Sequence, residues 1–225
     1  MEPVRTLDGL WSYGLRALVF NLALALGLGF GALAPARAAE GVKTILALGD
    51  SLTHGYGLPD AEIFPVQLEK ALAAAGVTAK VINAGVSGDT TAGGLARLDW
   101  ALGDPAAPPD LVIVELGAND ALRALDPAEA EANLYAILTR LHEKGIKALL
   151  AGMLAPPNLG KDYGASFDAL YPRLAEKHQV PFYPFFLDGV ATIPALNQAD
   201  GMHPNGAGVA VIVEKITPLV IEALK

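Results

Sequence analysis

Short apolar runs alternate with amphipathic stretches from Lys43 to the end of the chain. The run Thr44–Leu48 stops at a Gly-Asp pair, which is typical of a buried strand, and residues 60–75 repeat apolar side chains at helical spacing. By the same criteria, further strands are predicted at Val81–Ile82, Leu111–Val114, Ala148–Leu154 and Pro181–Phe185. Further helices are predicted near 95–102, from Asp126 to about Lys144, in a stretch ending near His178, and over 206–224, where Pro218 should bend or restart the helix.

This alternation of strands and helices predicts an α/β fold. A parallel sheet of five strands with helices on both faces accommodates the pattern, because each parallel connection needs a crossover. Active sites of such folds lie at the carboxyl ends of the strands. No repeat, low-complexity tract or linker interrupts residues 39–225, which predicts one domain.

The first forty residues follow a different pattern. An uncharged apolar stretch lies between Arg16 and Arg37, with basic residues before it and Ala36-Arg37-Ala38 after it. This order predicts a secretory signal peptide over residues 1–38, cut after Ala38, and a periplasmic or secreted product. An uncleaved anchor is the alternative, since such a stretch can just span a bilayer, but its glycines and Pro35 weaken a helix there and favour cleavage.

Composition narrows the classes of protein further. With 52% hydrophobic residues the chain is not disordered, and without cysteine it has no disulfide framework, thiolate metal site or lipoprotein anchor. Its net charge of −8 argues against binding to nucleic acid, which needs a basic face. Cleavage after Ala38 would remove three arginines, Glu2 and Asp8, which makes the remaining domain slightly more acidic.

Four segments at predicted strand ends or near the C-terminus carry candidate chemistry. Alone, each has a plain structural explanation: a helix cap, a turn, an Asx turn or a surface histidine. Because the fold brings these places to one edge of the sheet, together they predict a nucleophile, a base, a carboxylate and hydrogen-bond donors. The segments are Gly49–Leu52 with Ser51, Val86–Thr90 with Gly88, Gly117–Asp120 with Asn119, and Asp200–Pro204 with His203.

These four segments, in this order, resemble the conserved blocks of the SGNH (GDSL-type) hydrolases. The stretches 94–98, 114–120 and 180–186 are similar, more narrowly, to the bacterial periplasmic arylesterase and multifunctional acyl-CoA thioesterase/lysophospholipase branch. The resemblance implies a flavodoxin-like three-layer α/β/α sandwich on a five-stranded parallel sheet.

The resemblance also implies roles for individual residues. Ser51 would be the nucleophile, His203 its base and Asp200 the carboxylate that orients the imidazole. The oxyanion hole would combine the N–H groups of Ser51 and Gly88 with the side-chain amide of Asn119. His54, three positions after Ser51, is the competing candidate for the base, although a helix-start or rim role is favoured for it.

Apolar loops suggest where an acyl or aryl group would bind. In the relatives, the loop after Asn119 moves over acyl chains, which assigns Leu122 and Leu125 to substrate binding; an ordinary core position is the alternative for both. Pro156 and Leu159 would form a second wall. We expect no cofactor, no metal and a monomeric protein acting on a small ester.

The leading hypothesis is an exported serine esterase acting on acyl or aryl esters, of arylesterase, thioesterase or lysophospholipase type. A carbohydrate acetyl-esterase on the same fold is one alternative. A noncatalytic envelope-binding protein is the other, although a binder has no need for the full set of site residues.

Overall fold

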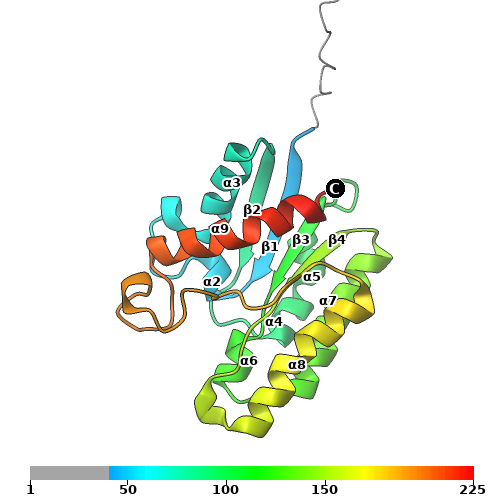
Figure 1. Ribbon diagram of the computed structural model, residues 1–225. Helices are drawn as coiled ribbons and strands as arrows, with labels where there is room; N and C mark the ends of the chain where they lie inside the picture. The colour runs from blue at the N-terminus through cyan, green and yellow to red at the C-terminus, as the bar shows by residue number, and fades with distance from the viewer. Residues whose placement is uncertain (1–40) are drawn as a thin grey trace, which may run out of the picture. The chain divides into compact units, whose positions relative to one another are not determined.

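Five parallel strands pair in the order β2-β1-β3-β4-β5 (Figure 1). The computed structural model describes residues 41–225, which form one compact unit, and the predicted signal peptide lies outside the described residues. The predicted fold class, an α/β fold on a five-stranded parallel sheet, is confirmed. The strands are β1 (Lys43–Gly49), β2 (Ala79–Gly85), β3 (Leu111–Glu115), β4 (Lys147–Ala151) and β5 (Phe182–Tyr183).

The central strands are buried on both faces. All of β3 and the last five residues of β1 are inaccessible to solvent, as expected for parallel strands covered by helices on either side. The register aligns Gly49 of β1 with Gly85 of β2 and with Glu115 of β3. The segments that follow these strands therefore start at the same level, along one edge of the sheet.

Helices cover the sheet on both sides. In Figure 1, α9 crosses in front of the strands with α3 beside it, and α7 packs against α4 and α8. No helix among residues 41–225 is both long and apolar enough to cross a membrane. The longer helices are α3 (Phe64–Ala74), α7 (Pro127–Glu143), α8 (Lys161–His178) and α9 (Gly206–Ala223). The short ones are α2 (Ser51–His54), α4 (Thr91–Ala96), α5 (Leu98–Leu102), α6 (Ala118–Leu122) and the 3₁₀ turns η1 (Asp60–Glu62), η2 (Pro157–Leu159) and η3 (Pro194–Leu196).

The helix predicted over residues 60–75 is wrong at its start. A 3₁₀ turn, η1, is followed by an extended Ile63, and α3 begins only at Phe64. Pro65 explains the break, because proline has no N–H to donate and its ring would clash with the carbonyl four residues earlier. Proline is tolerated only in the first turn, which is where α3 places it.

The helix predicted near 95–102 is also wrong in extent. Two short helices replace it, and the first of them, α4, begins at Thr91, ahead of the predicted start near residue 95. The Thr90 side chain caps α4 by accepting a hydrogen bond from the Gly93 amide across 3.3 Å. Gly94 is needed because a Cβ there would lie 2.3 Å from a methyl carbon of Leu116, so close packing outweighs the low helix propensity of glycine.

Strand lengths and the last helix differ in smaller ways. β4 ends at Ala151 rather than Leu154, and β5 is only two residues long because Pro181 and Pro184, on either side of it, cannot donate to a sheet. β2 extends beyond the predicted pair of residues. α9 continues through Pro218 without restarting, since Pro218 and Glu214 are exposed and water can bind the carbonyl that proline leaves free.

Candidate active site

Ser51, His203 and Asp200 lie in a hydrogen-bonded series at the carboxyl edge of the sheet. His203 Nε2 is 2.9 Å from Ser51 Oγ, and His203 Nδ1 is 2.6 Å from Asp200 Oδ2. Ser51 is the first residue of α2, directly after β1, and the other two residues come from the loop before α9. With the Nδ1 proton directed at Asp200, Nε2 faces the serine hydroxyl as an acceptor, which is the arrangement of a serine hydrolase.

The loop itself holds Asp200 in its charged form. Asp200 Oδ1 accepts hydrogen bonds from the backbone N–H groups of Met202, across 2.9 Å, and of His203, across 3.0 Å. These bonds, with the one from the His203 ring, lower the pKa of Asp200 to about 2. The carboxylate is therefore ionised at neutral pH and can stabilise a positively charged imidazole.

Gln198 fixes the base-bearing loop against the segment that follows Ser51. Its backbone N–H donates to the His203 carbonyl across 2.7 Å, and its side-chain amide donates to the carbonyls of Tyr56 and Pro204 across 2.8 and 3.0 Å. Two segments far apart in sequence are joined by this side chain. Sequence patterns gave no indication of it.

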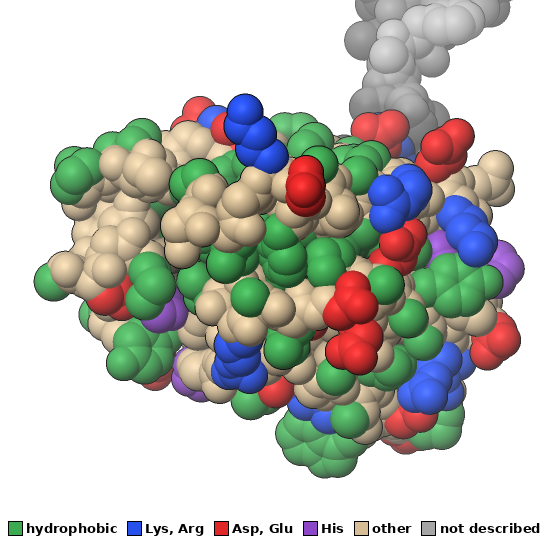
Figure 2. Space-filling model, turned by 90° about the horizontal axis from the view of Figure 1, so that it is seen from below, with side chains coloured by type: hydrophobic (Ala, Val, Ile, Leu, Met, Phe, Trp, Pro, Cys, Tyr) green, Lys and Arg blue, Asp and Glu red, His purple; other side chains and the backbone are tan. Residues whose placement is uncertain are grey.

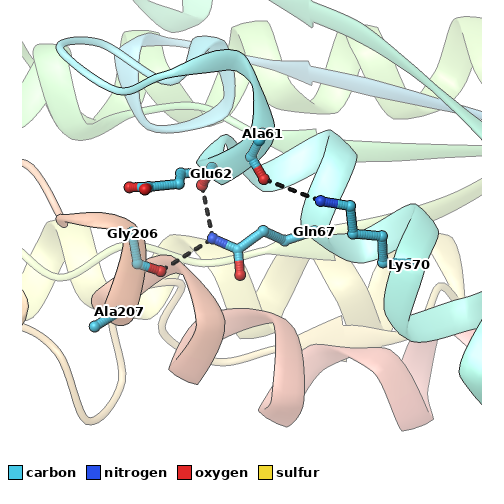
Figure 3. A pocket seen from close by; sticks show the side chains of 6 residues that line it. All are labelled: Ala61, Glu62, Gln67, Lys70, Gly206 and Ala207. Carbon is cyan, nitrogen blue, oxygen red and sulfur yellow. Dashed lines mark hydrogen bonds between the residues drawn. The ribbon is translucent and has the colours of Figure 1, made fainter.

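A second glutamine ties the start of α9 to α3. Gln67 Nε2 donates to the carbonyls of Glu62, across 2.7 Å, and Gly206, across 3.0 Å, as Figure 3 shows. These residues border a hollow of about 380 Å³. Neither Ser51 nor His203 lines that hollow, so we do not interpret it as the substrate site. The residues around it instead connect α3 to the start of α9, directly after the loop that carries His203.

The three predicted oxyanion-hole donors differ in whether they already make hydrogen bonds. Among the hydrogen bonds of residues 41–225, none engages the backbone N–H of Ser51 or of Gly88. Gly88 has φ of +86°, a conformation that a residue with a Cβ adopts only under strain. The Asn119 amide nitrogen, in contrast, donates to Asp50 Oδ2 across 3.0 Å and to the Asp89 carbonyl across 2.9 Å, which accounts for both of its hydrogens.

Two buried carboxyl groups, those of Asp50 and Glu115, contact the residues on either side of Ser51. Glu115 Oε2 accepts from the Thr53 hydroxyl across 2.7 Å and from the Asp50 backbone N–H across 3.4 Å. Burial raises the pKa of Asp50 to about 6, and burial together with the charge of Asp50 raises the pKa of Glu115 well above its ordinary value. In the sequence, the one indication that Glu115 belongs to the site is that this charged residue ends an otherwise apolar strand.

Further contacts missed from the sequence hold the loop that carries Gly88. Arg97 pairs with the Asp89 carboxylate and donates to the Gly49 carbonyl across 2.9 Å. The Thr91 hydroxyl donates to the buried Asp120 carboxylate across 2.6 Å. These bonds join the end of β2 to the ends of β1 and β3, between residues that no local pattern relates.

The competing base candidate lies elsewhere. His54 is exposed at the end of α2. Its backbone N–H donates to the Asp50 carbonyl across 2.9 Å, and its backbone carbonyl accepts from the Asn83 side-chain amide across 3.1 Å. Among the described residues, no hydrogen bond joins the His54 ring to Ser51. The same part of the chain contains no group of three or more histidine and carboxylate side chains that could hold a metal ion.

The predicted substrate-binding residues lie at the surface rather than in the core. Leu122 is 55% and Leu125 37% exposed, and Pro156 and Leu159 are partly exposed. The Tyr163 hydroxyl donates to the Leu125 carbonyl across 2.8 Å and thereby ties the loop after α6 to the start of α8, directly after Leu159 and Gly160. Figure 2, which looks at the molecule from below the view of Figure 1, shows hydrophobic side chains scattered among polar ones on that side of the molecule.

Comparison with known proteins agrees with this geometry. Residues 47–211 match the GDSL-like lipase/acylhydrolase family, and the chain belongs to that family. It is a GDSL-type carboxylic ester hydrolase.

The similar proteins carry esterase and thioesterase names. The chain is 39% identical to esterase TesA of Pseudomonas aeruginosa, covering 78% of this chain and 87% of the relative. It is also 39% identical to an arylesterase of Vibrio mimicus, covering 83% and 92%. Thioesterase 1/protease 1/lysophospholipase L1 of Escherichia coli K12 is again 39% identical, covering 74% and 78%. Among solved structures, the SGNH-hydrolase family esterase AlinE4 is 50% identical with a TM-score of 0.70, covering 83% of this chain and 98% of that one.

Proposed function

We propose that this protein is an exported serine esterase that hydrolyses acyl and aryl esters, including thioesters, through an acyl-enzyme on Ser51. The observation that carries the proposal is the series of short hydrogen bonds from Asp200 through His203 to Ser51. The names of the relatives, which include an arylesterase and a thioesterase/lysophospholipase, support the range of substrates.

The reaction proceeds in two halves. Ser51 Oγ attacks the carbonyl carbon of the ester while His203 Nε2 takes the hydroxyl proton, and the resulting imidazolium is stabilised by the ionised Asp200. His203 then gives this proton to the leaving oxygen or sulfur as its bond to the carbonyl carbon breaks. A water molecule, deprotonated in turn by His203, attacks the acyl-enzyme and releases the acid and the free Ser51 hydroxyl.

The tetrahedral intermediate carries a negative oxygen that needs donors. Within residues 41–225 no hydrogen bond occupies the N–H groups of Ser51 and Gly88, so these groups can bind it. Asn119 would join them by exchanging its bond to the Asp89 carbonyl for one to the oxyanion. Asn119 would retain its hydrogen bond to Asp50, because leaving the buried Asp50 carboxylate without a partner costs more free energy than leaving the Asp89 carbonyl without one.

The exposed leucines at the end of α6 and in the loop after it supply an apolar surface for the acyl chain. Leu122 and Leu125, together with Pro156 and Leu159, favour an acyl or aryl group over a sugar. A carbohydrate acetyl-esterase needs polar side chains at such positions to bind hydroxyl groups. We therefore expect the substrates of this site to include long-chain thioesters and lysophospholipids.

The activity is tested with the mature domain and its Ser51→Ala variant. A fluorophosphonate probe should label the wild type on Ser51 and leave Ser51→Ala unlabelled. p-Nitrophenyl esters from acetate to palmitate, an acyl-CoA and a lysophospholipid then define the substrate. Near-wild-type hydrolysis by purified Ser51→Ala would disprove the mechanism, and absence of both labelling and hydrolysis would favour the noncatalytic binder.

Export is a separate part of the proposal. Expression of the full chain in a Gram-negative host, followed by fractionation and N-terminal sequencing, should give a periplasmic product that begins at Ala39. A membrane-bound product with an intact N-terminus would favour the uncleaved anchor instead.

A further inference from the structure

Tyr56 places an aromatic ring against His203. The two ring centroids are 4.7 Å apart, and the ring planes are inclined by 38°. The tyrosine nevertheless remains 53% exposed, so a large part of its surface is free to contact another molecule.

The backbone of Tyr56 is fixed at both of its polar groups. Its N–H donates to the Ser51 carbonyl across 3.1 Å, and its carbonyl accepts from Gln198 Nε2 across 2.8 Å. These bonds attach Tyr56 to the helix that carries Ser51 and to the loop that carries His203. The ring therefore has a defined position relative to both reacting side chains.

The chemistry determines which part of a substrate meets this ring. His203 delivers a proton to the leaving group, so the leaving group must lie at the imidazole, whereas the acyl chain extends toward a different surface. An exposed aromatic ring beside the proton donor is suited to contact an aryl leaving group, because aromatic pairs attract one another beyond simple burial.

We propose that Tyr56 is a specificity-determining residue that binds the aromatic part of the leaving group. The inference rests on the proposed ester hydrolysis by Ser51 and His203 and adds a selectivity to it. It assigns the two ends of the substrate to two surfaces. The acyl end lies at Leu122 and Leu125, and the leaving group lies at Tyr56.

The test compares two acetates that differ in the aromaticity of an otherwise similar leaving group. Benzyl acetate and cyclohexylmethyl acetate both release a primary alcohol, so the ratio of their kcat/KM values reports binding of the ring. Tyr56→Ala and Tyr56→Leu should lower this ratio by about 3- to 10-fold, the effect of one aromatic pair. Tyr56→Phe should keep the wild-type ratio.

Three control measurements make the result decisive. Trp100→Ala removes an exposed aromatic side chain on α5 and should leave both rates unchanged. Leu122→Ala should shift the preference for acyl length but not the benzyl ratio. Circular dichroism shows whether each variant is folded, and Tyr56→Leu replaces Tyr56→Ala if the latter is not.

Each outcome supports or overturns a distinct statement. An equal loss on both acetates in Tyr56→Ala and Tyr56→Leu would mean that Tyr56 only holds His203 in place, and would overturn the proposal. Unchanged rates on both acetates in these variants would overturn it as well. Failure of a fluorophosphonate to label Ser51 of the wild type, or retained activity in Ser51→Ala, would instead refute the proposed function.

Discussion

Asp50 and Asn119 are joined by a hydrogen bond of 3.0 Å from the asparagine amide to the buried carboxylate. The other carboxylate oxygen of Asp50 accepts from the Leu52 backbone N–H across 2.9 Å and thereby caps α2. A single side chain thus sets the start of the helix that carries Ser51 and the orientation of a proposed oxyanion donor. Asp50 is in this sense a positioning residue.

Replacement of Asp50 by asparagine should reduce turnover. One oxygen remains to cap α2, but the new amide group would present hydrogens to the Asn119 amide, which then turns or moves away. Loss of one bond to a charged acceptor corresponds to about a 10- to 100-fold decrease in kcat. Steady-state kinetics on p-nitrophenyl acetate measure the change, with Asp104→Asn, an exposed loop aspartate, as the matched control.

A wild-type kcat in folded Asp50→Asn would contradict the positioning role. An increase in KM with no change in kcat would contradict it too, because the Asn119 amide is proposed to act on the transition state rather than on the bound ester.

Removal of the Asn119 side chain should affect turnover more than binding. Asn119→Ala deletes the donor that is proposed to stabilise the oxyanion, and loss of one such donor lowers kcat by about 10²- to 10³-fold. KM should change little, because the ground-state carbonyl gains little from this donor. A proportional increase in KM at constant kcat would assign Asn119 to substrate binding instead.

The parallel sheet was predictable because its strands are recognisable from adjacent residues alone. Ile45–Leu48 and Leu111–Val114 are uninterrupted apolar runs, as expected for strands that are buried on both faces. The start of α4 was predicted too late in the chain because it depends on the packing of Gly94 against Leu116, a contact between two separate elements.

The site was predictable in its reactive residues and not in their supports. Ser51, Gly88, Asn119 and His203 stand in short motifs, and the structure brings them to one edge of the sheet, although their chemical roles stay predictions. Gln198 and Arg97 support the site, and Tyr56 lies against His203, through contacts between residues far apart in sequence, and such contacts leave no periodic or compositional signal.

Arg97 should stabilise the fold through the loop that carries Gly88. Arg97→Ala removes the ion pair with Asp89 and the bond to the Gly49 carbonyl, which should lower the free energy of unfolding by about 2 kcal/mol. Urea denaturation measures the loss. In a double-mutant cycle with Asp89→Ala, a coupling energy near zero would show that the pair contributes nothing beyond its separate members.

The buried carboxyl pair should make stability depend on pH. Burial raises the folded-state pKa of Asp50 to about 6 and that of Glu115 well above its ordinary value. A raised pKa means that the folded protein binds protons more tightly than the unfolded chain. The contribution of such a group is fully present below its unfolded pKa, near about pH 4, and is lost as pH rises through the folded pKa.

Glu115→Gln removes one of these groups while keeping the shape of the side chain. The variant should gain stability relative to the wild type as pH rises from about 4 to about 8, because the neutral amide has no proton to lose. Urea denaturation across this range measures the difference, with Glu143→Gln, an exposed position at the end of α7, as the matched control. A difference between wild type and Glu115→Gln that stays constant over the whole range would show that Glu115 does not couple proton binding to folding.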